Sequence, residues 1–122
     1  MSNQCQNDEK KYKYDLEERT AKFGERVIIF SSKLTKNPLT MPIISQLIRS
    51  TTSIGANYCE ANECNSKKDF QHKISIAKKE AKETMYWLEM AAELDKNLKE
   101  PARKLWQEAH ELVLIFSSIL KK

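Results

Sequence analysis

The chain has 122 residues, of which 40% are hydrophobic and 31% are charged, and it contains only two Gly and three Pro. A chain of this length can bury a core without disulfides or a metal, and the scarcity of Gly and Pro argues against many short strands joined by turns. The formal net charge of +4 permits attraction to phosphate, but it is far below that of a dedicated nucleic-acid-binding arm. We therefore expect one all-α domain.

The N-terminal segment is polar, with no Leu, Ile, Val or Phe in residues 1–13. A signal peptide needs an apolar segment there, and the longest apolar runs of the chain, at 27–30 and 112–116, are too short to span a bilayer. We expect residues 1–13 to form a flexible leader and residues 14–122 to form the helical domain. We also expect a cytoplasmic protein that does not contact a membrane.

Hydrophobic residues at alternating steps of four and three predict the first helix, over about 14–36. The segment KNPLTMP, with Pro38 and Pro42, ends it, and a second helix is predicted over about 42–62. The seam of the first helix is Leu16, Thr20, Phe23, Val27, Phe30 and Leu34. The seam of the second is Ile44, Leu47 or Ile48, Thr51, Ile54, Tyr58 and Ala61.

Ser66 followed by Asp69 has the spacing of a helix N-terminal capping box and predicts a third helix over about 67–95. Pro101 suits the first turn of a fourth helix over about 101–121. Short links between long helices predict an antiparallel up-down-up-down four-helix bundle. The third seam is Phe70, Ile74, Ala77, Ala81, Thr84, Leu88, Ala91 and Leu94, and the fourth is Leu105, Ala109, Leu112, Phe116 and Ile119.

Residues 49–63, RSTTSIGANYCEANE, fill the middle of the second helix with poor helix formers. In a hairpin closed near residue 64, positions equidistant from the turn face each other, which pairs Arg49 with Glu80 and Glu60 with Lys73. We expect Ser50, Ser53, Gly55 and Ala56 to let the helices approach, and Ser or Asn side chains to hydrogen-bond across the gap. A structural polar network is the favoured interpretation of Arg49, Ser53, Asn57, Glu60 and Glu80. A ligand site is the alternative.

The third helix also concentrates basic residues, which we treat as a candidate RNA- or DNA-binding site. Against this interpretation, Glu80 and Glu83 interleave with the lysines, and lysines on a helix face are commonly just solvated. Tyr86, Trp87 and Trp106 could stack on bases or anchor a subunit interface, although buried packing is the favoured use. The candidate residues are Lys67, Lys68, Lys73, Lys78, Lys79 and Lys82.

Catalytic and metal-binding signatures are not apparent. A di-iron bundle needs two Glu-x-x-His pairs, whereas His72 and His110 are preceded at that distance by Asp69 and Gln107. No glycine-rich phosphate loop and no local signature of a nucleophilic triad is present. Cys59 and Cys64 could join His72 around a metal, but a fourth ligand is missing. We expect no enzyme activity, no cofactor and no metal.

The segments LIRSTTSIGANYCEANE and SKKDFQHKISIAKKEAKETMYWLE carry a resemblance to a known family. Between Leu47 and Leu94 the chain resembles the four-helix-bundle proteins encoded by intervening sequences in bacterial 23S rRNA genes. The matching motif residues are Arg49, Ser50, Ser53, Ile54, Ala56, Asn57, Glu60, Ala61, Ser66, Asp69, Phe70, Lys73, Ala77, Glu80, Glu83, Tyr86, Trp87 and Leu88.

The resemblance implies a ring-like homopentamer and supplies no catalytic residue. It also implies a relationship to the accessory proteins of diversity-generating retroelements, which are basic pentamers that bind nucleic acid and a reverse transcriptase. We expect a non-catalytic oligomeric scaffold, associated with RNA or DNA and, by family analogy, with a reverse transcriptase. The alternative is a protein–protein assembly module that does not bind nucleic acid.

Overall fold

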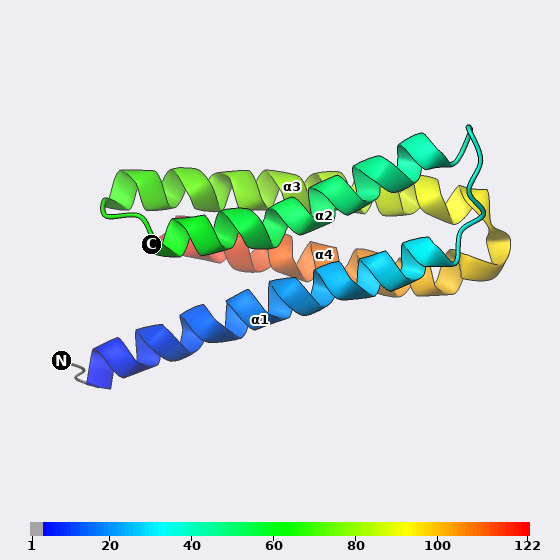
Figure 1. Cartoon of the computed structure of the whole chain (residues 1–122). Helices are drawn as coiled ribbons and strands as arrows, with labels where there is room; N and C mark the ends of the chain where they lie inside the picture. Colours follow the sequence, from blue (N-terminus) through cyan, green and yellow to red (C-terminus); the bar gives the residue numbers. More distant parts are fainter. Residues whose placement is uncertain (1–3) are drawn as a thin grey trace.

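The computed structural model describes the backbone of residues 4–122 and the side chains from Asp15 onward, and within these residues it is built from helices without strands. Four α-helices follow one another along the chain and lie side by side, as Figure 1 shows. They are α1 (Gln4–Ser32), α2 (Met41–Asn62), α3 (Lys67–Leu94) and α4 (Lys99–Leu120), with a short 3-10 turn, η1 (Lys96–Leu98), before α4. The prediction of an all-α protein is confirmed.

The bounds of α1 differ from those expected. The helix begins at Gln4 rather than near residue 14, so most of the segment expected as a leader continues α1. It ends at Ser32 rather than near residue 36. There the ammonium group of Lys36 lies 3.2 Å from the carbonyl oxygen of Ser31 and 3.0 Å from that of Leu34. The lysine thus satisfies carbonyls at the helix end.

Local side-chain chemistry sets the starts of α2 and α3. The Ser66 hydroxyl accepts a hydrogen bond from the backbone N–H of Asp69 at 3.1 Å, which confirms the predicted cap of α3. Before α2, Thr40 does not cap the helix with its side chain. Its hydroxyl instead donates to the carbonyl of Thr35 at 2.6 Å, and Asn37 accepts the N–H groups of Leu39 and Thr40. These bonds fold residues 35–40 into a tight connection.

The core is formed by the predicted seams, which the structure buries almost completely. The exceptions are Leu16, Phe70, Leu94 and Ile119 at the ends of the helices, which are partly buried. Because the central positions of α3 are Ala77, Ala81 and Thr84, both neighbouring helices pack closely against it. Contacts are extensive between α2 and α3 and between α3 and α4. By contrast, α1 packs mainly on α2 and touches α4 far less.

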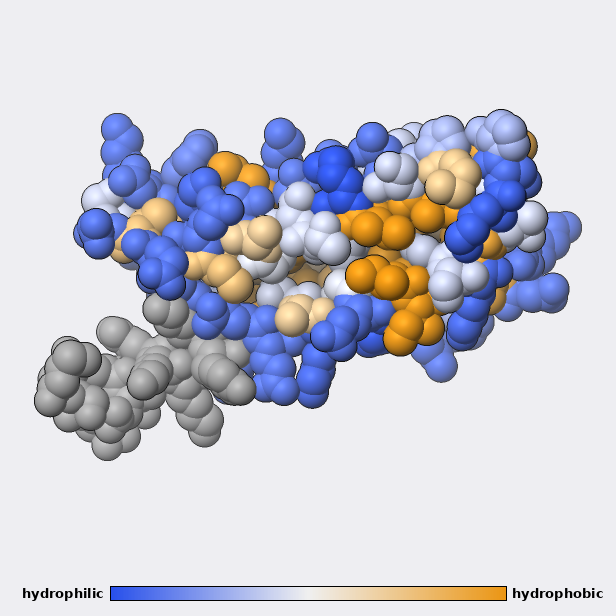
Figure 2. All heavy atoms as spheres, in the orientation of Figure 1, coloured by the Kyte–Doolittle hydropathy of each residue, from blue (hydrophilic) through white to orange (hydrophobic). Residues whose placement is uncertain are grey.

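An apolar patch is exposed where α1 ends and α2 begins. Figure 2 shows hydrophobic residues gathered over this part of the molecule. Large exposed side chains there include Ile28 and Ile29 on α1, Leu39 in the connection and Met41 at the start of α2. Leu39 is the most exposed of them, at 77% of its surface. Clustered apolar surface of this kind is typical of a face that contacts another molecule.

Candidate nucleic-acid interface

One outward stripe of α3 carries a run of cationic and aromatic side chains. Residues spaced by three or four positions share a helix face. From 68 to 86 the exposed residues of this face are Lys68, His72, Ser75, Lys79, Lys82 and Tyr86, and the exposed Glu89 and Glu93 continue it toward the end of α3. From Lys68 to Lys82 the stripe extends about 21 Å, at about 1.5 Å per residue. Tyr86, 51% exposed, lies one turn beyond Lys82. We refer to these residues as the α3 stripe.

The other predicted lysines lie outside the α3 stripe. Lys73 is turned toward α2, where its ammonium group lies 2.7 Å from the Glu60 carboxylate, and this hydrogen bond raises the pKa of Lys73. Lys78 is half-buried, and Lys67 is exposed in the first turn of α3, beside a cleft of about 880 Å³ that α4 also lines. The structure therefore brings together only part of the predicted basic cluster.

Glu80 and Glu83, the acidic residues that interleave with the lysines, are engaged by Arg49 of α2. The Arg49 guanidinium lies 3.3 Å from Glu80 and also pairs with Glu83. The side chain of Glu80 is only 14% exposed, and that of Glu83 is 32% exposed. In the part of the chain that the structure describes, no ion pair joins a lysine of the α3 stripe to a carboxylate. The intervening acids are therefore neutralised on the side of α3 that faces α2.

The polar centre of α2 agrees with prediction in part. The expected Arg49–Glu80 and Glu60–Lys73 pairs are both present. A buried hydrogen bond across the helices comes from Thr84, whose hydroxyl lies 2.9 Å from that of Ser50. The expected bond across the gap is therefore made by a serine, whereas the Asn57 amide donates to the carbonyl of Ser53 within α2 at 2.9 Å.

Gly55 packs against α1 and not against α3, the helix that was expected to approach it. An added Cβ would lie 3.1 Å from the hydroxyl oxygen of Thr20 on α1, so this glycine permits close approach of α1 rather than α3. Thr20 is itself buried, and its hydroxyl bonds to the carbonyls of Leu16 and Glu17. The small residues of α2 therefore accommodate both of its neighbours.

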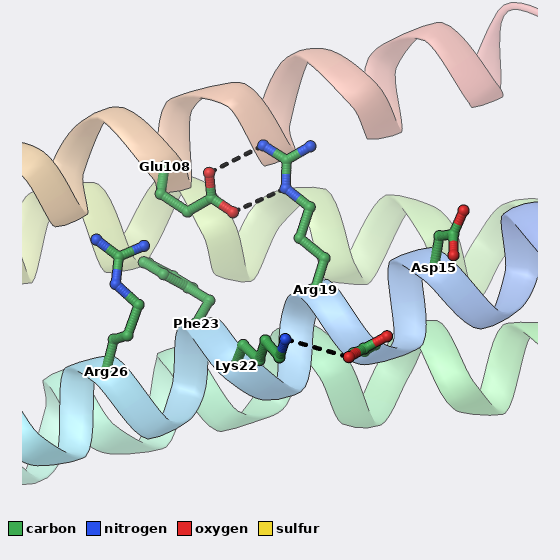
Figure 3. Close-up of a pocket in the computed structure, with 7 residues that line it drawn as sticks. Asp15, Arg19, Lys22, Phe23, Arg26 and Glu108 are labelled. Atoms are coloured by element: carbon green, nitrogen blue, oxygen red, sulfur yellow. Dashed lines mark hydrogen bonds and ion pairs between the residues drawn. The ribbon is translucent and has the colours of Figure 1, made fainter.

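A charged cluster between α1 and α4, which the sequence did not reveal, is centred on Arg19 (Figure 3). The guanidinium makes two hydrogen bonds to Glu108, at 2.8 and 2.9 Å, and a third to Glu111 at 3.0 Å. These bonds raise the pKa of Arg19. Figure 3 also shows Lys22 paired with a carboxylate on α1, which is Glu18 at 3.2 Å. The cluster ties α1 to α4 where their packing is sparse.

The aromatic residues follow the expectation of buried packing in part, because Trp87 and Trp106 pack against the core and Tyr86 does not. Tyr86 is exposed on the α3 stripe, with its ring edge-on to Trp87 at 5.0 Å between centroids. Trp87 is half-buried, and its indole N–H donates to Glu83 at 3.3 Å. On α4, Trp106 stacks on His110 at 5.4 Å. Tyr86 is thus the aromatic side chain that lies in line with the exposed lysines.

Across the described residues, His, Cys, Asp and Glu do not gather in groups of three or more that could bind a metal ion. The thiol of Cys64 donates to the carbonyl of Glu60 at 3.3 Å. None of the helices in the same residues is both long enough and apolar enough to cross a membrane.

Comparisons with known proteins give a family match and a structural match. The sequence profile of the 23S rRNA-intervening sequence proteins matches residues 13–118. A crystal structure from Bacteroides thetaiotaomicron, of a protein of unknown function from the S23 ribosomal protein family, superposes with a TM-score of 0.78 at 32% sequence identity. The match covers 87% of this chain and 98% of that chain. No curated protein matches the chain significantly.

Proposed function

Because the chain belongs to the 23S rRNA-intervening sequence protein family, we propose that it is a non-catalytic, homo-oligomeric scaffold that binds RNA or DNA. The observation that carries this proposal is the α3 stripe. Lys68, Lys79 and Lys82 project from one exposed face, while Arg49 engages Glu80 and Glu83, the acids next to Lys79 and Lys82 in sequence. Phosphate binding requires spaced, accessible cations, and this face provides them.

The lysines of the α3 stripe contact the phosphate backbone, and Tyr86 offers an exposed ring for an unpaired base. Lysine contacts with phosphates position a protein without reading sequence. Discrimination between nucleic acids therefore comes from their shape and from single-stranded segments. Neither role needs a cofactor, a metal or a catalytic group.

Oligomerisation multiplies this weak attraction. The up-down-up-down bundle assembles into a ring-like homopentamer in the cytoplasm, with Ile28, Leu39 and Met41 of the exposed apolar patch supplying contact surface. Copies of the α3 stripe around a ring bind one polyanion together, so that modest affinity per subunit becomes useful avidity. A reverse transcriptase is a candidate protein partner by family analogy.

A protein–protein assembly module is the second candidate function. The observation that favours it is the same apolar patch, where Leu39 and Ile29 are 77% and 58% exposed. If this second candidate is correct, the lysines of the α3 stripe are solvated surface residues that bind no ligand. The two candidates differ in which substitutions abolish binding: lysine substitutions for the nucleic-acid scaffold and apolar substitutions for the assembly module.

The experiment is fluorescence anisotropy with the purified oligomer, whose mass is first determined by light scattering. The ligands are a structured rRNA fragment, an unrelated duplex and a single strand, each measured across a range of salt concentrations. The test variant combines Lys68→Gln, Lys79→Gln and Lys82→Gln. The matched control combines Lys96→Gln, Lys99→Gln and Lys121→Gln, which removes the same charge from exposed positions outside α3.

For the proposed scaffold, log Kd depends steeply on log salt, and the α3 variant lowers this slope by about 2–3 for each subunit that contacts the ligand. The matched control lowers it much less. Absence of binding at low salt, or equal loss in both variants, refutes the α3 stripe as the interface. A monomer mass at micromolar concentration refutes the oligomer.

A further inference from the structure

A second groove lies between α1 and α4, away from the α3 stripe. It has a volume of about 220 Å³ and adjoins the Arg19 cluster, with Arg26 lining both. In Figure 3, Arg26 rises from α1 beside Phe23 toward α4. The residues that line the groove are Arg26, Ile29, Phe30 and Lys33 of α1 and Pro101, Lys104 and Leu105 of α4.

The lining of this groove combines apolar and cationic side chains. Arg26, Lys33 and Lys104 are exposed, and no carboxylate is among the lining residues. Within the described residues, these three cations make no ion pair. Glu100, one turn before Lys104, acts on it electrostatically but is itself held by Arg103, with 3.0 Å between Nε and Oε2. The groove therefore carries uncompensated positive charge.

Ile29 gives the groove an apolar anchor point. Its side chain is 58% exposed and lies beside exposed Pro101, whereas Phe30 and Leu105 form a floor that is almost fully buried, at 4% and 3%. Arg26 and Lys33 are two helical turns apart, or about 10.5 Å along α1. A partner helix that places apolar residues on Ile29 would bring its flanking side chains within reach of both cations.

We propose that the α1–α4 groove docks an acidic amphipathic helix of a partner protein. Helix-in-groove recognition uses apolar residues on one face of the bound helix, and the accessible apolar surface of the groove is formed by Ile29 and Pro101. Glu or Asp beside those positions complements Arg26, Lys33 and Lys104. The aliphatic surface distinguishes this groove from the α3 stripe, whose exposed side chains are lysine, histidine, serine and tyrosine. A peptide therefore suits the groove better than a polyanion.

The test is selection from a displayed library of 18-residue amphipathic helices. Leu, Ile, Phe or Met occupies the apolar positions, and Glu, Gln or Lys is allowed at the flanking ones. The selecting proteins are the full chain, the groove variant R26Q/K33Q/K104Q, and K68Q/K79Q/K82Q, which removes the same charge from the α3 stripe. Enriched peptides are then measured by anisotropy against each protein and against Ile29→Ser, with circular dichroism as a check of folding.

The expected result is enrichment of acidic peptides by the full chain and by the α3 variant. The groove variant should bind them about tenfold more weakly, as the loss of three exposed charge interactions implies, and Ile29→Ser about fivefold more weakly. Two outcomes overturn the proposal. In one, the full chain does not enrich acidic peptides over the others. In the other, it enriches acidic peptides whose affinity is unchanged by every groove substitution. RNA binding that is lost in the groove variant and competes with the peptides also overturns it, by assigning the groove to phosphate. The α3 stripe is measured separately, so the two proposals fail independently.

Discussion

Two buried threonines of the helix interface should respond in opposite ways to the same substitution. Thr51 is 1% exposed, and its hydroxyl has no hydrogen-bond partner. Thr84 is fully buried, and its hydroxyl bonds to Ser50 at 2.9 Å and to the carbonyl of Glu80 at 2.8 Å. Valine has the same shape as threonine, so Thr→Val at each site changes polarity and leaves packing unaltered.

The magnitudes follow from the state of each hydroxyl. Thr51→Val removes an unsatisfied buried group and adds a methyl, which should raise the free energy of unfolding by about 1–2 kcal/mol. Thr84→Val loses two hydrogen bonds, each worth about 0.5–1.5 kcal/mol, partly offset by the added methyl, for a net loss of about 1 kcal/mol. The two variants should therefore differ by about 2–3 kcal/mol.

Urea unfolding, followed by circular dichroism at one fixed protein concentration, measures the difference. Thr52→Val is the control, because Thr52 is exposed and bonds only to carbonyls of its own helix. It should change stability by less than about 0.5 kcal/mol. If Thr51→Val destabilises the protein as much as Thr84→Val does, the hydrogen-bond assignment of these two hydroxyls is wrong.

Three further predictions concern glycine packing, a partly buried ion pair and alkaline pH. Gly24→Ala should stabilise the protein by about 1 kcal/mol, because among the described residues nothing beyond its own helical turn lies within 4 Å of the added Cβ. Gly55→Ala should be neutral or destabilising by up to about 2 kcal/mol, because the added Cβ would lie 3.1 Å from Thr20 on α1. The midpoints of urea unfolding measure both effects. Arg19→Met should lower the free energy of unfolding by about 1–2 kcal/mol, because it leaves the Glu108 carboxylate, whose side chain is 17% exposed, without its partner. Adding Glu108→Gln to this variant should recover part of the loss. If the effects of the two substitutions are fully additive, the pairing is contradicted. Burial raises the pKa of Tyr58, so the stability that its neutral form contributes is complete below pH 10 and is lost as the pH rises through the folded-state pKa. Tyr58→Phe should remove this loss of stability at alkaline pH. If the free energy of unfolding of Tyr58→Phe depends on pH between 9 and about 11.5 as that of the unsubstituted protein does, the assignment is refuted.

The helix seams could be predicted from sequence because burial follows the period of an α-helix. Phe23, Leu47, Ala81 and Phe116 fall on that period and are all buried. The Arg49–Glu80 pair could also be predicted, because a short connection fixes the register of α2 against α3. In both cases the information lies in local spacing.

The contacts that escaped prediction depend on how non-consecutive elements are rotated. Arg19 and Glu108 are 89 residues apart, and no turn of fixed length sets their register. Whether Gly55 faces α1 or α3 likewise depends on the rotation of α2 about its own axis. In the candidate site, the same limit applies to Glu83. The sequence did not predict that this carboxylate is turned toward α2, where it pairs with Arg49. Charge sequence alone could not separate the exposed lysines from those turned toward α2.

The uneven attachment of α1 implies an order of events when the native state opens. Because α1 rests chiefly on α2 and is joined to α4 mainly by the Arg19 cluster, its detachment exposes less apolar surface than separation of α3 from either neighbour. Amide protons of α1 should therefore exchange with solvent through a partial opening, while those of α3 exchange only on global unfolding. The chain then behaves as a cooperative three-helix unit with a fourth helix that can detach first.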